Sequence, residues 1–148
     1  KAKKKGNLKT GEENLYACGS FILINNQKQI LIAPQNYAPE QKYMILSTKV
    51  GHPGWVIKNK SRLILTNTDK HKSFVRILKT FRAGSAIYAP IMNSNKVIGQ
   101  IICASQARYV MEEIDLSALC ILSNLASWYY FKLNGRDEIQ KIYSKHRQ

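Results

Sequence analysis

The stretch SAIYAPIMNSNKVIGQIICAS, residues 85–105, contains two apolar runs separated by the polar trio Asn93-Ser94-Asn95. Asn and Ser favour turns because their short side chains hydrogen-bond nearby backbone and Asn tolerates left-handed conformations. Two apolar runs joined by so short a polar link are typical of a β-hairpin. We therefore predict that residues 85–105 form two adjacent antiparallel strands.

Further strands are predicted on the N-terminal side of this hairpin. LYACGSFILI (15–24) and QILIA (29–33) are joined by a short polar link, which predicts a second hairpin. YMILSTK (43–49) and SRLILTN (61–67) are expected to be shorter extended segments. Because the apolar runs are nearly continuous, we expect both faces of the sheet to be covered.

Helices are predicted between and after these strands. Pro53 is tolerated in the first turn of a helix, so a short helix is expected over 53–58. A second helix is predicted before Ala83-Gly84, where apolar residues recur at i, i+3, i+4 and i+7 (Phe74, Ile77, Leu78, Phe81). A long helix follows within 111–133, and a short one after Asn134-Gly135.

The long helix is apolar on two sides. Its wider stripe comprises Ile114, Ala118, Ile121, Leu122, Leu125, Trp128 and Tyr129, and a narrower one comprises Leu116, Cys120, Ser127 and Phe131. A helix with two apolar sides packs against two partners, here its own sheet and a second copy of the chain. We expect the homodimer interface to contain Leu116, Cys120 and Phe131.

Length and charge bound the domain organisation and the partners. The chain has 148 residues, as expected for one domain, and a net charge of +14. We predict a flexible basic leader at 1–14, a domain at 15–133 and a C-terminal helical extension at 134–148. The basic ends leave open an alternative function, a module that binds nucleic acid or an anionic surface. No apolar run reaches the ~20 residues of a transmembrane helix.

The residues that carry chemistry are few. Cys18, Cys103 and Cys120 form no CxxC pair, and their apolar neighbours favour reduced thiols in a cytoplasmic setting. Asp69 and His71 are too few to predict a metal site. The sequence shows no catalytic constellation and identifies no cofactor, so we expect a protein that is not an enzyme.

The order of elements predicts an α+β fold, an antiparallel sheet with helices on both faces. Three segments resemble the GAF domain, a sensory fold related to PAS: GHPGWVIKNKSRLILTN (51–67), GSAIYAPIMNSNKVIGQIICAS (84–105) and MEEIDLSALCILSNLASWYY (111–130). The resemblance covers residues 15–133. It implies a domain that binds a small molecule or a partner and signals through its terminal helices to an output domain of a larger chain.

The resemblance also implies a pocket on the sheet face opposite the long helix. Its expected ligand-binding residues are Trp55, Phe74, Ser85, Tyr88, Cys103 and Ser105. An aromatic wall with a few polar groups would hold and orient a small molecule.

The sequence lacks the residues that several activities of GAF relatives require. The segment Asn67-Thr68-Asp69-Lys70 lacks the order typical of cyclic-nucleotide binders. No cysteine lies within 51–82 to attach a bilin. Methionine sulfoxide reductases of this fold use cysteines around the Gly-rich turn and the following helix, and the corresponding stretches GHPGW and LKTFRAG contain none. These differences favour a non-catalytic sensor.

Overall fold

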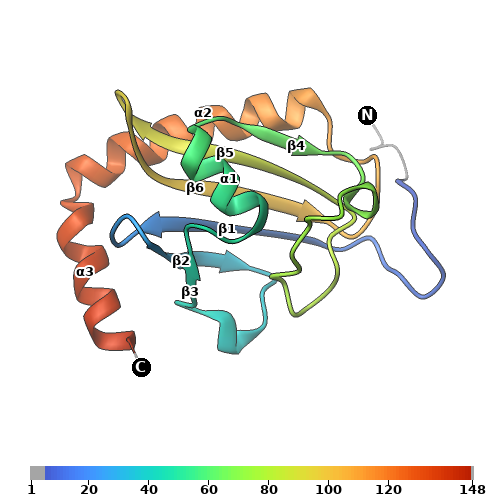
Figure 1. Ribbon diagram of the computed structural model, residues 1–148, viewed down its shortest axis with the longest axis horizontal. Coiled ribbons are helices and arrows are strands. Elements are labelled where there is room, and N and C mark those ends of the chain that lie inside the picture. Colours follow the sequence, from blue (N-terminus) through green and yellow to red (C-terminus); the bar gives the residue numbers. More distant parts are fainter. Residues whose placement is uncertain (1–5, 148) are drawn as a thin grey trace.

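The computed structural model describes residues 6–147 and shows one six-stranded antiparallel sheet with helices on both of its faces (Figure 1). The strand order is β3-β2-β1-β6-β5-β4. The predicted α+β fold is confirmed. Within residues 6–147, no helix is long and apolar enough to cross a membrane.

The elements follow the predicted order, with one exception described below. The strands are β1 (Tyr16–Leu23), β2 (Lys28–Gln35), β3 (Ile45–Ser47), β4 (Leu63–Leu65), β5 (Ser85–Asn93) and β6 (Lys96–Ser105). The helices are α1 (Gly51–Asn59), α2 (Glu113–Lys132) and α3 (Gly135–His146), with short 3-10 turns at Pro39–Gln41 and Thr68–Lys70.

The hairpin β5–β6 lies near the centre of the sheet. Its register pairs Ser85 with Ser105 and Asn93 with Lys96, as the turn at Asn93-Ser94-Asn95 predicts. On its other side, β6 pairs with β1. A Cβ added at Gly99 would lie 2.2 Å from the carbonyl oxygen of Phe21, so this glycine allows β1 to approach β6 closely.

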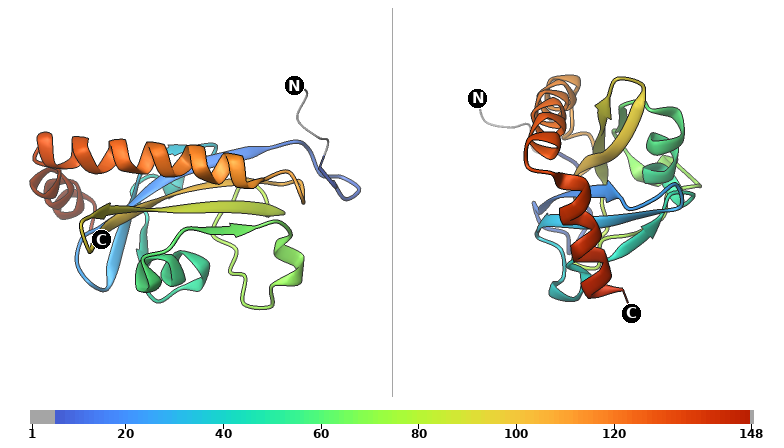
Figure 2. Two further views of the ribbon diagram at one scale, coloured as in Figure 1. Left: turned by 90° about the horizontal axis from the view of Figure 1, so that it is seen from above. Right: turned by 90° about the vertical axis from the view of Figure 1, so that its left-hand side faces the viewer.

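The sheet separates two apolar cores. Alternate residues of β5 point to opposite faces, so Ala86 and Tyr88 belong to the core beneath α1, whereas Ile87 and Ala89 belong to the core beneath α2. Figure 2 shows α1 and α2 on opposite sides of the sheet. The near-continuous apolar runs of the strands are explained by this double coverage.

The segment predicted as a helix from its apolar spacing, residues 68–81, is irregular after the turn at Thr68–Lys70. Its backbone is satisfied by a side chain instead of a helical ladder: Gln41 Nε2 donates to the Ile77 carbonyl over 2.9 Å, and Gln41 Oε1 accepts from Lys79 N over 3.0 Å. Phe81 and Leu78 are nevertheless buried. The apolar positions predicted burial correctly and secondary structure wrongly, because tertiary hydrogen bonds replaced local ones.

The orientation of α2 reverses the sequence-based prediction. Leu116 is only 2% exposed and packs in the core beneath α2, so it cannot belong to a dimer interface. Cys120 is partly buried against the same core, and only Phe131 of the three predicted interface residues is exposed. The wider stripe faces solvent instead; its large exposed members are Ile114, Ile121, Leu122, Leu125, Trp128 and Tyr129.

Small side chains explain which side of α2 faces the sheet. Ser123 is buried and donates to the Cys120 carbonyl over 2.8 Å, and Ser127 donates to the carbonyl of Met92 on β5 over 2.7 Å. Serines at these positions let the helix lie close to β5 while satisfying their hydroxyl groups. The bulky residues are therefore left on the outer side.

The C-terminal helix α3 is confirmed and folds back toward the β1–β2 turn (Figure 1). Gln140 Nε2 donates to the Ile24 carbonyl over 2.9 Å, and Ile139 is buried in the core beneath α2. The rings of His146 and Tyr43 are stacked, with centroids 4.4 Å apart. Residues 135–146 are thus packed on the domain.

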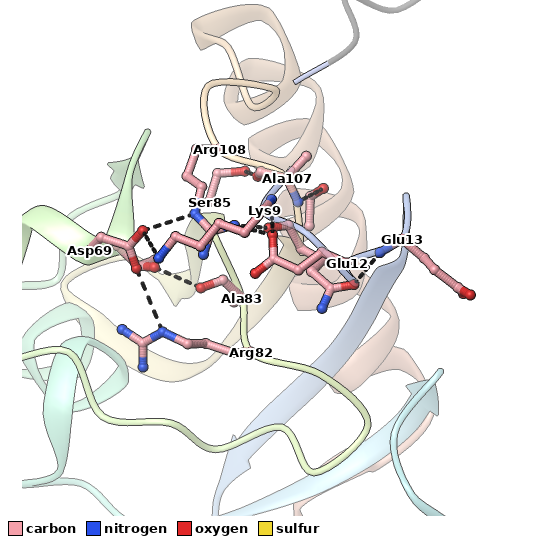
Figure 3. A network of polar contacts seen from close by, with 12 residues as sticks. Lys9, Glu12, Glu13, Asp69, Arg82, Ala83, Ser85, Ala107 and Arg108 are labelled. Atoms are coloured by element: carbon pink, nitrogen blue, oxygen red, sulfur yellow. Dashed lines mark hydrogen bonds and ion pairs between the residues drawn. The ribbon is translucent and has the colours of Figure 1, made fainter. Parts of the chain in front are cut away.

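The predicted flexible leader, residues 1–14, falls partly outside the described residues. From Asn7 onward it contacts the domain, because Asn7 forms a β-bridge with Arg108. Glu12 pairs with the buried guanidinium of Arg108, and Lys9 Nζ lies 2.9 Å from Asp69 Oδ2 (Figure 3). These polar contacts attach the segment to the loops beside β5 and β6.

Candidate ligand pocket

A small pocket lies beneath α1 and the irregular segment 71–84, on the sheet face opposite α2. Its volume is about 40 Å³, room for a few water molecules. The lining is mainly aromatic and aliphatic: Phe21, Tyr37, Pro53, Phe74, Val75, Arg76, Ile77, Leu78, Ala83, Ala86, Tyr88, Ile102 and Ala104.

Two tyrosines, the buried Tyr88 and the half-buried Tyr37, give the pocket its hydroxyl groups. Burial raises the pKa of Tyr88 well above its ordinary value, and the neighbouring Tyr37 adds to this rise. Burial also raises the pKa of Tyr37, with smaller contributions from Cys18 and Cys103. Both hydroxyls therefore stay protonated at neutral pH, and each can donate one hydrogen bond.

His52 stands beside the pocket at the start of α1. Its ring centroid lies 6.0 Å from that of Phe74 and 6.5 Å from that of Tyr88. Its Nδ1 atom is buried and has no hydrogen-bond partner among the described residues. Burial, and then the nearby His71, lower the pKa of His52, so the imidazole is neutral at pH 7. His52 Nδ1 thus has unused hydrogen-bonding capacity, and its ring lies beside the rings of Phe74 and Tyr88.

A buried polar contact fixes α1 above the sheet. Gln100 Nε2 donates to the Pro53 carbonyl over 2.9 Å and to Gln29 Oε1 over the same distance. Both glutamines are fully buried. Pro53 also lines the pocket, so this contact helps to hold α1 in place over the pocket.

Only part of the predicted set of ligand-binding residues meets in this pocket. Phe74 and Tyr88 line it. Ser85 and Ser105 do not line the pocket. Their hydroxyl groups bind the backbone of Ala107: Ser85 Oγ donates to the Ala107 carbonyl over 2.8 Å, and Ser105 Oγ accepts from Ala107 N over 3.2 Å. The two serines stabilise the loop that follows β6.

Trp55 and Cys103 do not belong to the pocket. Trp55 is 43% exposed, because Pro53, Gly54 and Val56 form the side of α1 that faces the sheet. Cys103 faces the core beneath α2, since its neighbour Ile102 takes the pocket side of β6. Strand alternation in QIICAS could have placed Cys103 correctly once the side of one neighbour was known.

The sequence pattern did not single out Phe21, Tyr37 or His52 as residues at the pocket. Phe21 follows from the same alternation in β1, which places it with Ala17 beneath α1. Tyr37 stands between two prolines in a loop, where no periodicity signals burial. The sequence pattern assigned His52 no role, because its position beside the pocket depends on how α1 packs.

Comparison with solved structures places the fold in a known group. The GAF domain of an Acinetobacter phosphoenolpyruvate-protein phosphotransferase matches with a TM-score of 0.71 and 22% identity, over 80% of this chain and 73% of that one. A type II free methionine-R-sulfoxide reductase from Thermoplasma acidophilum matches with a TM-score of 0.66 and 14% identity, over 75% of each chain.

A third similar structure is the second GAF domain of DevS from Mycobacterium smegmatis, with a TM-score of 0.63 and 9% identity over 83% of this chain and 85% of that one. At these identities the similarity shows the fold alone. No curated protein sequence matches the chain. The sequence model of the GAF domain, however, matches residues 12–129. The chain therefore belongs to the GAF domain family.

Proposed function

We propose that this GAF domain is a non-catalytic sensory or regulatory domain that binds a small, largely apolar molecule beneath α1. The observation that carries the proposal is a small, largely apolar pocket beside a buried ring nitrogen, His52 Nδ1, that has no hydrogen-bond partner among the described residues. A buried polar atom of this kind costs free energy unless a water or a ligand satisfies it. An aromatic wall with few polar groups is the usual composition of a small-molecule site.

The size of the pocket indicates how binding would act on the domain. A volume of about 40 Å³ is far below the ~300 Å³ of a typical ligand pocket, so a larger ligand must displace residues 74–78. That segment has no helical or strand ladder and is held by individual contacts, such as the hydrogen bond from Gln41 Nε2 to the Ile77 carbonyl. A ligand that binds only the displaced conformer shifts the equilibrium toward it, which is the coupling a sensor needs.

The proposal is tested by native mass spectrometry of the purified chain, followed by thermal-shift screening with small apolar acids, amides and heterocycles. A retained molecule or a stabilising ligand supports it. In Ala86→Val, the added methyl groups narrow the pocket and should abolish the shift. Ala89→Val, on the same strand but the opposite face, is the matched control and should keep it. A ligand that stabilises both variants equally does not bind in this pocket.

The absence of a cysteine from the pocket lining supports a non-catalytic role. Among the structural relatives are free methionine-R-sulfoxide reductases. In this chain Cys18, Cys103 and Cys120 all pack with the core beneath α2, behind the sheet. We expect no consumption of free methionine-R-sulfoxide with dithiothreitol as reductant, measured by amino-acid chromatography. Turnover that Cys103→Ser abolishes would show that the chain is an enzyme.

The outer face of α2 is proposed as the homodimer surface through which the domain signals. Ile114, Ile121 and Leu125 are all exposed, and at 100° per residue they point directly away from buried Leu116. Large apolar side chains gathered on one exposed face are typical of an interaction surface. Leu125→Lys should lower the dimer fraction in sedimentation velocity, whereas Asn124→Lys, an exposed polar position on the same helix, should not. Identical sedimentation of both variants and the unmodified chain excludes this surface.

A further inference from the structure

Two cysteines far apart in the chain meet on the sheet face beneath α2. Cys18 of β1 and Cys103 of β6 are directly opposite each other in the antiparallel ladder, so their side chains leave the sheet on the same face. Cys103 Sγ donates to Cys18 Sγ over 2.9 Å. Residues directly opposite in such a ladder have Cα atoms about 4.5–5.5 Å apart, within the range that a disulfide spans.

The pair is reachable from outside. A cleft of about 340 Å³ opens between the sheet and the first half of α2, lined by both cysteines and by Met111, Asp115, Leu119 and Leu122. Both cysteine residues are half-buried. Cys120 is not among the residues that line this cleft. The cleft therefore admits a small reagent to one particular pair of thiols.

We infer that Cys18 and Cys103 form a redox-active dithiol that low-molecular-weight disulfides convert into a cross-strand disulfide. This site lies behind the sheet from the proposed ligand pocket and does not depend on it. The hydrogen bond from Cys103 lowers the pKa of Cys18, against the opposing effect of burial. Cys18 is thus the thiol that attacks first, because the thiolate is the nucleophile.

The reaction balances in two exchange steps. The Cys18 thiolate attacks a disulfide R–S–S–R, which gives a mixed disulfide Cys18–S–S–R and releases one RS⁻, protonated to RSH. The Cys103 thiol loses its proton and attacks Cys18 Sγ, which forms the Cys18–Cys103 bond and releases the second RSH. The two cysteines lose two electrons and two protons, and the low-molecular-weight disulfide gains them.

The test treats the native, full-length chain with hydroxyethyl disulfide and follows intact mass and peptide maps. The expected product has lost two hydrogen atoms, contains a peptide that joins Cys18 to Cys103, leaves Cys120 open to alkylation, and returns to the starting mass with dithiothreitol. Cys103→Ser should stop at a stable mixed disulfide on Cys18. Cys120→Ser, the matched control, should behave like the unmodified chain.

Three results would overturn the inference: a mixed disulfide that persists in the unmodified chain, a joined peptide that includes Cys120, or thiols that react only after denaturation. All three are measured on the unmodified chain, so a variant that fails to fold leaves the test intact. Far-UV circular dichroism of each oxidised sample establishes that the fold is retained.

Discussion

The Nε atom of Arg108 lies 3.0 Å from Oδ2 of Asp69, although the two residues are 39 positions apart in the chain. The Arg108 side chain is only 4% exposed, and its Nη1 pairs with Glu12 of the N-terminal segment. One guanidinium therefore binds two carboxylates from different parts of the chain (Figure 3). The planar, forked group of arginine suits this role because separate nitrogens can serve separate acceptors.

Replacing Arg108 by lysine should lower the free energy of unfolding by about 1–3 kcal/mol, because a single ammonium cannot reach both carboxylates in the same geometry. Urea denaturation measures the loss. The matched control is Arg82→Lys: Arg82 is half-exposed, and its Nε lies 3.7 Å from Oδ1 of the same Asp69. A long pair that is open to solvent contributes little, so the control should change stability by less than about 0.5 kcal/mol. Equal effects of the two substitutions would show that Arg108 has no special role.

The free energy of unfolding should decrease in acid, because Glu12 and Asp69 become protonated and lose their ion pairs. The hydrogen bond from Lys9 lowers the pKa of Asp69, desolvation opposes it, and the hydrogen bond from Arg108 adds to the lowering. Desolvation would raise the pKa of Glu12, but contacts with Arg108 and Lys9 outweigh it. A lowered folded-state pKa means that the stabilisation is present above the unfolded pKa and is lost as pH falls through the folded one.

The measurement is the free energy of unfolding by urea from about pH 6 down to about pH 3, a range that spans the ordinary pKa values of both carboxyls. Asp69→Asn should make the decline shallower. Glu113→Gln serves as control, because its carboxylate forms only a long exposed pair with Arg62 at 3.8 Å. A decline that is equally steep in Asp69→Asn would mean that other groups cause the acid sensitivity.

The orientation of α2 is tested by two leucines with opposite environments. Leu116→Ala should destabilise the chain by about 2–4 kcal/mol, because Leu116 is buried and its removal leaves a cavity. Leu125→Ala, at a 51% exposed position, should cost less than about 1 kcal/mol under dilute conditions that favour the monomer. Thermal and urea unfolding compare the two, and the reverse order of effects would contradict this orientation.

The contact between Gln100 and Pro53 should contribute to holding α1. Gln100→Leu keeps side-chain bulk but removes the donor, which leaves the Pro53 carbonyl and Gln29 Oε1 buried without it. The expected cost is about 1–3 kcal/mol, and amides of α1 should exchange hydrogen faster than in the unmodified chain. Gln35→Leu, at an exposed position on β2, should change neither quantity. Unchanged exchange in Gln100→Leu would show that α1 is held by apolar contacts alone.

Much of the fold could be predicted because its signals are local. The turn trio after Met92 set the β5–β6 hairpin, and Pro53 marked the first turn of α1. The family resemblance added the arrangement of the two helices on opposite faces. Local signals failed at Phe74–Phe81, where Gln41, a residue from another loop, supplied the hydrogen bonds that a helix would have made internally.

The candidate site was only half predictable. Phe74 and Tyr88 both line the pocket, as the resemblance implied, and their binding of a ligand stays a prediction. Trp55 and Cys103 were placed wrongly, because a residue's side in a short helix or a strand depends on which neighbour faces inward. Tyr37 and His52 reach the pocket through the packing of a loop and a helix end, which no periodicity encodes.

The sequence by itself determined which residues share a face, through the twofold repeat of the strands and the 3.6-residue repeat of the helices. Only the tertiary structure decided which of those faces turns inward. In α2 both faces are apolar, and the small side chains of Ser123 and Ser127 allowed one of them to lie close to β5, which left Ile121, Leu125 and Trp128 outside. Hydropathy measures how strongly a side chain avoids water, whereas the choice of face depends on shape complementarity with a partner that lies far away in the sequence.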